Sequence, residues 1–230
     1  MTGQSSRQSN GLRLLDAFSC AGGAGMGYYL AGFDVVGVDI EPQPNYPFDF
    51  HQGDAIRFIR DYGREFDAIH ASPPCQADCT LTAGTNRDRA NHVSLLAETR
   101  DALASTGRPY IIEQPIGKAV MSRSLVLCGL SFGLKVFRHR QFELSGLTVP
   151  QPEHPSHQGH RVRGWRHGRF YEGDMFAVYG NGGYKGTIAE WQEAMGIDWT
   201  SDRRELAEAI PPAYTRYIGE NLRFVESVAA

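Results

Sequence analysis

One cysteine of this chain stands in a setting that suggests covalent chemistry. It is Cys75, in the stretch HASPPCQADCT that covers residues 70–80. Pro73 and Pro74 fix φ and remove two backbone donors, so they form a stiff turn that presents the thiol instead of burying it in a strand ladder. A thiolate is a nucleophile and can form covalent intermediates. The setting therefore favours a positioned nucleophile over a packing cysteine.

The neighbouring Cys79 makes a metal site or a redox pair conceivable in the same stretch. A metal site is disfavoured, because no second CxxC and no nearby histidine pair completes four ligands. A redox pair usually has the spacing CxxC, whereas three residues separate Cys75 from Cys79. We therefore predict no metal site, and we expect Cys79 and Cys128 to be packing residues.

A carboxylate and two arginines could serve the same chemistry. Glu113 ends the apolar run in YIIEQPIG, where a carboxylate is costly to bury without a partner. We expect its side chain to reach the crevice at the strand end, although a carboxylate in a salt bridge at the rim explains it too. Arg138 and Arg140 flank a histidine in the stretch RHR, which on local grounds equally suits a solvated basic strand edge.

A glycine-rich turn, DAFSCAGGAGMG at residues 16–27, follows the first apolar run. Such a turn lets the backbone approach a ligand closely and aims a helix N-terminus at it. The pattern fits NAD, FAD and S-adenosylmethionine (SAM) alike, and a tight turn that serves only packing is the alternative. A strict GxGxxG is missing, because Cys20 stands where a first glycine is expected, and this disfavours a dinucleotide.

Two acids after the turn could hold a nucleoside. Asp39 ends the next apolar run, 23 residues after Asp16, where an acid commonly holds a ribose. Asp54 in QGDA could bond to an adenine amino group, and a helix N-cap is an equal alternative.

Alternating strands and helices must position these side chains. Glycine and proline bound the apolar runs, and this alternation predicts a doubly wound, mostly parallel sheet. Strands are expected at 12–18, 34–40, 66–74 and 109–115, and helices at 27–33, 92–107, 187–197 and 203–228.

Composition restricts the class of protein. The chain has 230 residues, of which 41% are hydrophobic and 21% charged, which suits one α/β domain with a small insertion. No run of 18 apolar residues occurs, and residues 1–11 read as a polar, flexible tail without a secretion signal. Four cysteines are too few for a disulfide scaffold, so we expect a cytoplasmic protein that is neither secreted nor bound to a membrane. The net charge of −3 means that a nucleic acid would need a local basic patch.

Residues 150–169 differ from the rest, with three prolines, four histidines and four arginines against one acid. Arginines grip phosphates or guanine edges, and an aromatic can stack on a base, so this segment is the best candidate for nucleic-acid contact. An exposed loop without special purpose, or a histidine-rich site for adventitious metal, would account for it too. The candidate side chains are Arg161, Arg163, Trp165, Arg166 and Arg169.

Taken together and in this order, the motifs resemble those of the DNA cytosine-5 methyltransferase family. DAFSCAGGAGMG looks like its SAM-binding motif, PPCQ like its nucleophile loop, EQP like its Glu-Asn-Val motif and RHR like its Arg-x-Arg strand. EAIPPAYTRYIG, residues 208–219, is similar to its closing helix motif. The resemblance covers residues 13–145 and 205–222.

The resemblance implies a Rossmann-like class I SAM-dependent methyltransferase fold, with a mixed, mostly parallel seven-stranded sheet. It implies SAM as cofactor and DNA as substrate, with the target cytosine flipped out or single-stranded. The implied catalytic residues are Cys75 as nucleophile, Glu113 facing the cytosine N3, and Arg138 and Arg140 steadying the base and loop. The implied SAM contacts are Phe18, Cys20, Gly22, Gly23, Asp39, Ile40, Asp54, Ala55 and Pro74, and Gln76 would contact the substrate.

The chain departs from the family at several positions, including Gln114-Pro115 in place of Asn-Val and Ile40 in place of an aromatic. We divide it into a tail (1–11), a catalytic SAM-binding region (12–145), a reduced recognition insert (146–200) and a C-terminal helix (201–230). Because the insert is short, a partner or a homodimer could supply specificity. The alternatives are a tRNA cytosine methyltransferase, an enzyme using a modified SAM or a free nucleotide, and a catalytically weak DNA-binding module. A nicotinamide dehydrogenase is disfavoured by Cys20.

Overall fold

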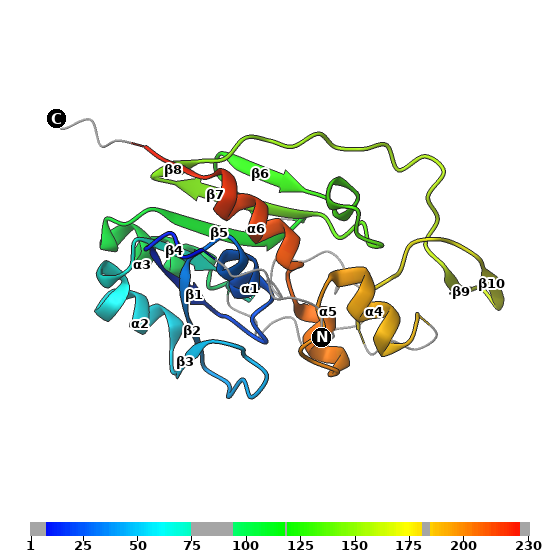
Figure 1. The fold of residues 1–230 in the computed structure, drawn as a ribbon, viewed down its shortest axis with the longest axis horizontal. Coiled ribbons are helices and arrows are strands. Elements are labelled where there is room, and N and C mark those ends of the chain that lie inside the picture. Colours follow the sequence, from blue (N-terminus) through cyan, green and yellow to red (C-terminus); the bar gives the residue numbers. More distant parts are fainter. Residues whose placement is uncertain (1–7, 75–93, 118, 181–184, 226–230) are drawn as a thin grey trace.

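A seven-stranded sheet forms the centre of the computed structural model, which describes residues 8–74, 94–117, 119–180 and 185–225 (Figure 1). The strand order is β3-β2-β1-β4-β5-β7-β6. Every pairing is parallel except those of β7, which runs antiparallel to both β5 and β6. The strands are β1 (Arg13–Ala17), β2 (Asp34–Asp39), β3 (Asp49–Gln52), β4 (Ala68–Ala71), β5 (Tyr110–Pro115), β6 (Ser124–Leu127) and β7 (Arg140–Ser145).

Helices cover both faces of this sheet, as the predicted doubly wound arrangement requires. Successive side chains of a strand point to opposite faces, so Leu14 packs with α1 and α6 while Leu15 packs with α2 and α3. Strands buried on both faces read as continuous apolar runs, which is why β1, β4 and β5 could be predicted. The helices are α1 (Gly23–Leu30), α2 (Ala55–Tyr62), α3 (Leu96–Thr106) and α6 (Pro212–Asn221).

A smaller group of elements lies beyond the sheet, to the right in Figure 1. Helices α4 (Ile188–Met195) and α5 (Arg203–Glu208) share an apolar cluster that includes Val136, Trp191 and Leu206. A two-stranded hairpin, β9 (Gly164–Arg166) with β10 (Arg169–Tyr171), protrudes there. A second small sheet pairs β8 (Leu147–Thr148) with β11 (Arg223–Phe224) near the C-terminus.

Two expectations about the elements need correction. The single helix predicted over 203–228 is two helices, α5 and α6, because Pro211 and Pro212 interrupt the helical ladder. The list of expected strands also lacks the edge strand β3 at residues 49–52, whose side chains are mostly exposed. Among the described residues, no helix is long and apolar enough to cross a membrane.

Candidate active site

The turn after β1 has an uncommon backbone. Phe18 and Cys20 adopt φ values of 58° and 44°, in the left-handed region that residues with a Cβ rarely enter. The Cys20 N–H donates a 3.0 Å hydrogen bond to Asp39 Oδ2 at the end of β2. This bond ties the turn to the end of β2, at the carboxyl edge of the parallel strands, where ligands of such sheets bind.

Two glycines in the turn are required by close approach. Gly22 has a φ of 82°, and a Cβ on it would lie 2.9 Å from the Tyr46 ring and from Pro47. A Cβ on Gly23 would lie 2.4 Å from the backbone oxygen of Ile210, just before α6. The C-terminal motif therefore packs directly against the start of α1, so the two ends of the predicted site meet.

The acids predicted to hold a nucleoside lie at one edge of the sheet. Asp39 is buried, and its Oδ1 accepts a 3.0 Å hydrogen bond from the Glu41 N–H. The Gly53 N–H donates to the Asp39 carbonyl, which places Asp54 on the adjoining strand end. Asp54 is the N-cap of α2, because its side chain accepts a 2.8 Å hydrogen bond from the Arg57 N–H, as the alternative interpretation of this residue predicted. The next residue, Ala55, is buried.

The chain's own groups fit a nucleoside cofactor at this edge. Ile40 follows Asp39 and is 65% exposed, which gives an apolar side chain on which a purine could lie. Ser19 Oγ and Asp16 Oδ1 are buried and have no hydrogen-bond partner among the described residues. Buried polar atoms normally have partners, so these two are suited to a polar ligand beside the turn. SAM, with its hydroxyl, amino and carboxylate groups, matches this donor and acceptor set.

Sequence reasoning missed the contact between Asp16 and Tyr46. Tyr46 donates from its hydroxyl to Asp16 Oδ2 at 3.2 Å. Burial raises the pKa of Asp16 to about 8, and the bonds from Tyr46 and from the Gly25 N–H only partly oppose that rise. The site therefore holds a carboxyl that is mostly protonated at neutral pH.

Glu113 and Arg140, two of the predicted catalytic residues, lie side by side where the end of β5 pairs with the start of β7. Arg140 Nε lies 2.7 Å from Glu113 Oε1, with side chains 15% and 7% exposed. The distance is that of an ion pair, yet Oε1 accepts no well-directed hydrogen bond within the described part of the chain. Burial raises the pKa of Glu113, and the Arg140 and Arg138 guanidinium groups oppose that rise. The carboxyl oxygen thus remains able to bond to a ligand.

The residue after Glu113 holds the loop that leads to Cys75. Gln114 is buried, and its Nε2 donates a 2.7 Å hydrogen bond to the carbonyl oxygen of Pro73. Strands β4 and β5 are parallel neighbours, so their carboxyl ends lie side by side. Cys75, Gln76 and Cys79 themselves lie outside the described residues.

The Arg138 side chain joins several backbone segments through hydrogen bonds. Its guanidinium group donates to the carbonyl oxygens of Ala207, Ala209 and Val178 at 2.6–3.0 Å. The Tyr214 hydroxyl on α6 donates a 2.9 Å bond back to the Arg138 carbonyl. The RHR stretch is therefore fastened to the C-terminal motif, and this contact was not foreseen from sequence.

A buried histidine supports the same loop. His70 on β4 contacts the Tyr28 hydroxyl at 3.1 Å through Nδ1 and Ser72 Oγ at 2.9 Å through Nε2. Burial lowers the pKa of His70 to about 3, so the ring is neutral and can serve both partners. A histidine inside an otherwise apolar strand was the available sequence signal for this group.

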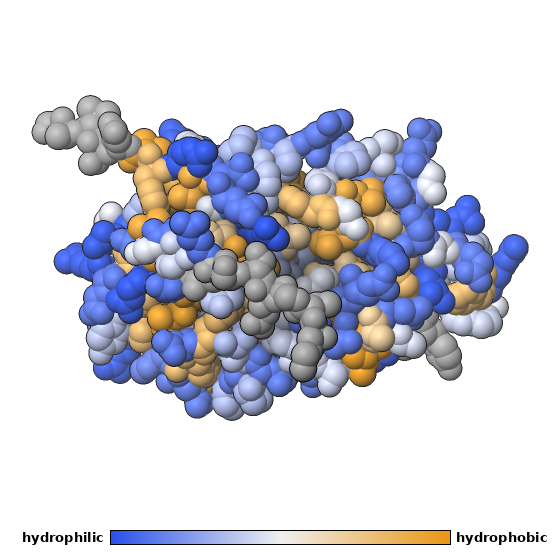
Figure 2. Space-filling view, in the orientation of Figure 1, coloured by the Kyte–Doolittle hydropathy of each residue, from blue (hydrophilic) through white to orange (hydrophobic). Residues whose placement is uncertain are grey.

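The predicted nucleic-acid residues divide into two sets. Arg163 is partly exposed and engaged in an ion pair, with its Nη1 2.7 Å from Glu190 Oε1. Arg161, Trp165 and Arg169 are exposed, and Trp165 is 56% exposed on the protruding hairpin. In the hairpin register, Trp165 pairs with Phe170 and Arg166 pairs with Arg169. In Figure 2 this end of the molecule is coloured mainly as hydrophilic residues.

Sequence comparisons give no relative. No protein-family model matches the chain, and a search of curated proteins finds no match.

Comparison of structures does give neighbours of similar fold. A chain described as a DNA modification methyltransferase encoded within an E. coli prophage aligns with a TM-score of 0.59 and 14% identity, over 91% of this chain and 97% of that one. S. pombe Dnmt2 methyltransferase aligns with a TM-score of 0.57 and 12% identity, over 90% and 96%. Entamoeba histolytica methyltransferase EhMeth aligns with a TM-score of 0.59 and 11% identity, over 90% and 96%. The chain has the Rossmann-like fold of class I SAM-dependent methyltransferases.

Proposed function

We propose that this protein transfers a methyl group from SAM to carbon 5 of cytosine in DNA, through a covalent bond between Cys75 and carbon 6. The observation that carries the proposal is the arrangement at the end of β5. A buried carboxyl, Glu113, lies against Arg140, and the next side chain, Gln114, holds the backbone two residues before Cys75. Glu113, Arg140 and the loop that leads to Cys75 therefore lie at the same edge of the sheet.

The chemistry explains why these groups belong together. Carbon 5 of cytosine is a poor nucleophile until a thiolate adds to carbon 6 and makes carbon 5 enamine-like. The addition places charge on the ring, which a carboxyl at N3 relieves by donating a proton or hydrogen bond. The raised pKa of Glu113 suits donation, because the carboxyl holds its proton to higher pH than an exposed glutamate. After methylation, loss of the carbon 5 proton expels the Cys75 thiolate and restores the double bond.

The cofactor part of the proposal rests on the glycine turn. SAM, when bound, supplies an electrophilic methyl sulfonium. Asp39 would hold its ribose hydroxyls, Asp54 its adenine amino group, and the backbone at Phe18, Gly22 and Gly23 would lie along it. Three structural neighbours described as methyltransferases, one of them for DNA modification, support this assignment.

The substrate part rests on the exposed residues of the insert. A base in a duplex cannot reach a thiol at a sheet edge, so it must be flipped out or single-stranded, at a cost of a few kcal/mol. Arg161 and Arg169 could contact phosphates, and Trp165 could stack on an unpaired base. Specificity could still come from a partner or a second copy.

Trapping on a modified base tests the reaction. DNA that contains 5-fluorocytosine should form an adduct with the protein that survives denaturation, because fluorine at carbon 5 blocks the final elimination. The adduct should require SAM and vanish in Cys75→Ser, while Cys79→Ser, the matched thiol four residues on, retains it. An adduct on cytosine-containing tRNA but not on DNA would establish the RNA alternative. Tight DNA binding without any adduct would establish the binding-module alternative.

A further inference from the structure

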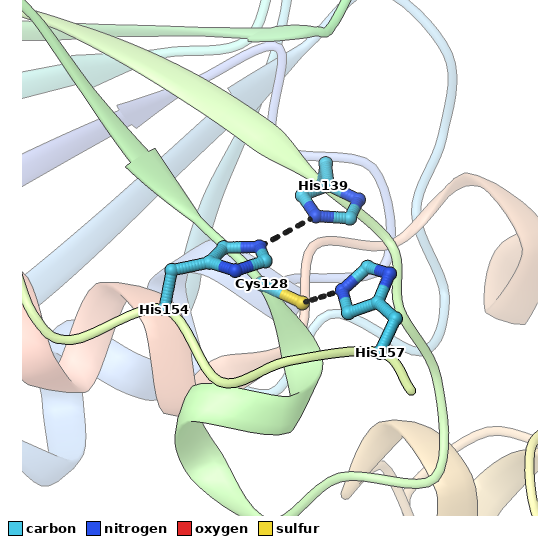
Figure 3. Close-up of side chains that lie close together, drawn as sticks. All are labelled: Cys128, His139, His154 and His157. Atoms are coloured by element: carbon cyan, nitrogen blue, oxygen red, sulfur yellow. Dashed lines mark hydrogen bonds between the residues drawn. The ribbon is translucent and has the colours of Figure 1, made fainter. Parts of the chain in front are cut away.

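Four side chains that the proposed reaction does not use converge at the free end of the β6–β7 pair (Figure 3). They are Cys128, His139, His154 and His157, and one ligand atom from each lies within 4.8 Å of all the others. Cys128 Sγ lies 3.4 Å from His157 Nε2, and His139 Nε2 lies 3.0 Å from His154 Nε2. One sulfur and three nitrogens therefore face a common centre.

The antiparallel ladder brings the first two of these side chains together. Leu127 at the end of β6 pairs with Arg140 at the start of β7. Cys128 and His139 are the next residues outward on the two strands, so they lie opposite each other although ten residues separate them in the chain. Cys128 is fully buried and His139 partly buried.

The other two ligands come from the insert, on a segment that is fixed independently of them. The Gln151 side chain bonds to both the N–H and the carbonyl of Val126 on β6, at 3.0 and 2.7 Å. Ser131 Oγ donates a 3.0 Å bond to the Glu153 carbonyl. These bonds place the following turn over the end of the β6–β7 pair, which is where His154 and His157 point inward in Figure 3.

Ring contacts orient the imidazoles as well. The His157 ring stacks on Phe137 at 4.2 Å between centroids, with an interplanar angle of 20°. The His139 and His154 rings stack at 5.2 Å and 17°. Oriented rings with converging nitrogens are a requirement for a metal site, since imidazole binds a metal only along its lone pair.

We propose that Cys128, His139, His154 and His157 bind one Zn²⁺ ion in a closed, structural site. Zinc takes thiolate and imidazole ligands in tetrahedral geometry, with bonds of about 2.3 Å to sulfur and about 2.0 Å to nitrogen. Such bonds correspond to ligand–ligand separations of roughly 3.3–3.6 Å, close to the 3.0 and 3.4 Å contacts. The other separations, all within 4.8 Å, would shorten to these values as the four side chains close on the ion.

The ligand set also indicates which metal binds. A thiolate with three imidazoles excludes Mg²⁺ and Ca²⁺, which require oxygen ligands. Four protein ligands leave no open position for a reacting water, which separates this site from catalytic zinc centres. Binding converts the Cys128 thiol to a thiolate and releases its proton.

The position of the site gives it a structural consequence. His139 stands between Arg138, which clamps α5, and Arg140, which contacts Glu113. A metal at His139 would fix this strand start and tie it to the insert through His154 and His157. The insert, the RHR stretch and the sheet would thus become one rigid unit. The metal site is independent of which reaction the protein catalyses.

Metal analysis of the full-length, tag-free protein tests the proposal directly. After dialysis, elemental analysis for zinc, iron, nickel and copper should find about one zinc per chain and little of the others. Cys128→Ser and His154→Ala should each lose most of the zinc, with affinity falling by more than about tenfold. His160→Ala is the matched control, because His160 is bonded to Asp174 and lies outside the four ligands. It should keep its zinc.

A second measurement guards against variants that fold poorly. Cobalt(II) added to the apoprotein should give intense visible bands of a tetrahedral centre together with a thiolate-to-cobalt charge-transfer band. His154→Ala, which changes an exposed residue, should weaken both, and Cys128→Ser should abolish the charge-transfer band. A wild-type protein that neither holds zinc nor yields these cobalt bands would overturn the proposal. So would zinc retained equally in Cys128→Ser, His154→Ala and the control.

Discussion

The Gln114 side chain donates a 2.7 Å hydrogen bond to the carbonyl oxygen of Pro73, both buried, and so joins the end of β5 to the loop that leads to Cys75. Glu113 and Gln114 are consecutive, so their side chains leave the strand in different directions. One contacts Arg140 and the other holds the loop. A single side-chain amide thereby fixes the Pro73 backbone relative to the end of β5.

Replacing Gln114 by methionine keeps the volume and removes the donor. The Pro73 carbonyl would then be buried without a partner, which costs about 1–3 kcal/mol in the free energy of unfolding. Because the loop would lose its anchor, single-turnover methyl transfer should fall at least tenfold while SAM affinity changes little. Gln141→Met is the control, since Gln141 donates a longer 3.2 Å bond to the Pro115 carbonyl one strand away. Equal losses in both variants would contradict this role.

The Asp16 carboxyl should make stability depend on pH. Its pKa is raised by burial from 3.8 to about 8, so between about pH 4 and 8 the folded protein holds a proton that the unfolded chain has released. The free energy of unfolding therefore falls as pH rises through this window. Asp16→Asn, which stays neutral, should match the wild type near pH 4 and exceed it by up to roughly 5 kcal/mol near pH 8.

Urea unfolding of both proteins at several pH values measures this difference. Asp49→Asn on the edge strand β3 is the control, because that residue is exposed. If the free energies of unfolding of the wild type and Asp16→Asn differed by a constant amount from pH 4 to 8, Asp16 would titrate as an ordinary acid.

Tyr214 should couple the C-terminal motif to the RHR stretch. Removing its hydroxyl in Tyr214→Phe leaves the Arg138 carbonyl without this bond, at a cost of about 1 kcal/mol in stability. Because Arg138 and Arg140 adjoin that carbonyl, turnover should fall more than stability alone explains. Tyr217→Phe is the matched control on the same helix, since its hydroxyl bonds to the exposed Pro150 carbonyl. Similar turnover in both variants would reject the coupling.

The parts of the fold that sequence predicted correctly are those fixed by local patterns. β1, the glycine turn and β2 follow from an apolar run, a glycine-rich segment and a second apolar run. β3 escaped prediction because an exposed edge strand carries polar side chains. The division between α5 and α6 was visible as Pro211-Pro212, yet the helical pattern on both sides concealed it.

In the candidate site too, local motifs indicated single residues, whereas contacts between residues far apart in the chain were not predicted. Motif order indicated Glu113 and Arg140 as candidate site residues, whereas their contact was not predicted and is seen only in the structure. The bonds from Tyr46 to Asp16 and from Tyr214 to Arg138 join residues 30 and 76 positions apart, which no local pattern encodes. Cys128 was taken for a packing residue because His139 lies beside it only when β6 and β7 pair, and His154 and His157 only when the insert covers the end of that pair.

Nucleic-acid binding should depend on the exposed residues of the insert. Each phosphate contact contributes about −0.9 to the slope of log affinity against log salt, so Arg161→Ala and Arg169→Ala should each flatten that slope by nearly one unit. Trp165→Ala should weaken binding of unpaired DNA by about 1–3 kcal/mol without changing the slope. Arg57→Ala on α2, also well exposed, is the control. Fluorescence anisotropy over a salt series measures all four, and slopes that match the control would remove the insert from the interface.

Cys20 should reveal the strain in the glycine turn. Its φ of 44° is costly for any residue with a Cβ, by about 1–2 kcal/mol. Cys20→Gly and Cys20→Ala both remove the thiol, so the difference between them isolates the backbone. We expect Cys20→Gly to be more stable than Cys20→Ala by about 1 kcal/mol. The control is the exposed helical residue Ala104, where the order should be reversed and Ala104→Gly should destabilise the protein by about 1 kcal/mol. Burial raises the pKa of the Cys20 thiol to about 12, so this cysteine should also resist alkylation at neutral pH. If alanine proved the more stable at both positions, the turn would have to relax in solution to a backbone that a Cβ tolerates. The hydrogen bond from Cys20 to Asp39 would then not fix the turn beside the predicted cofactor site.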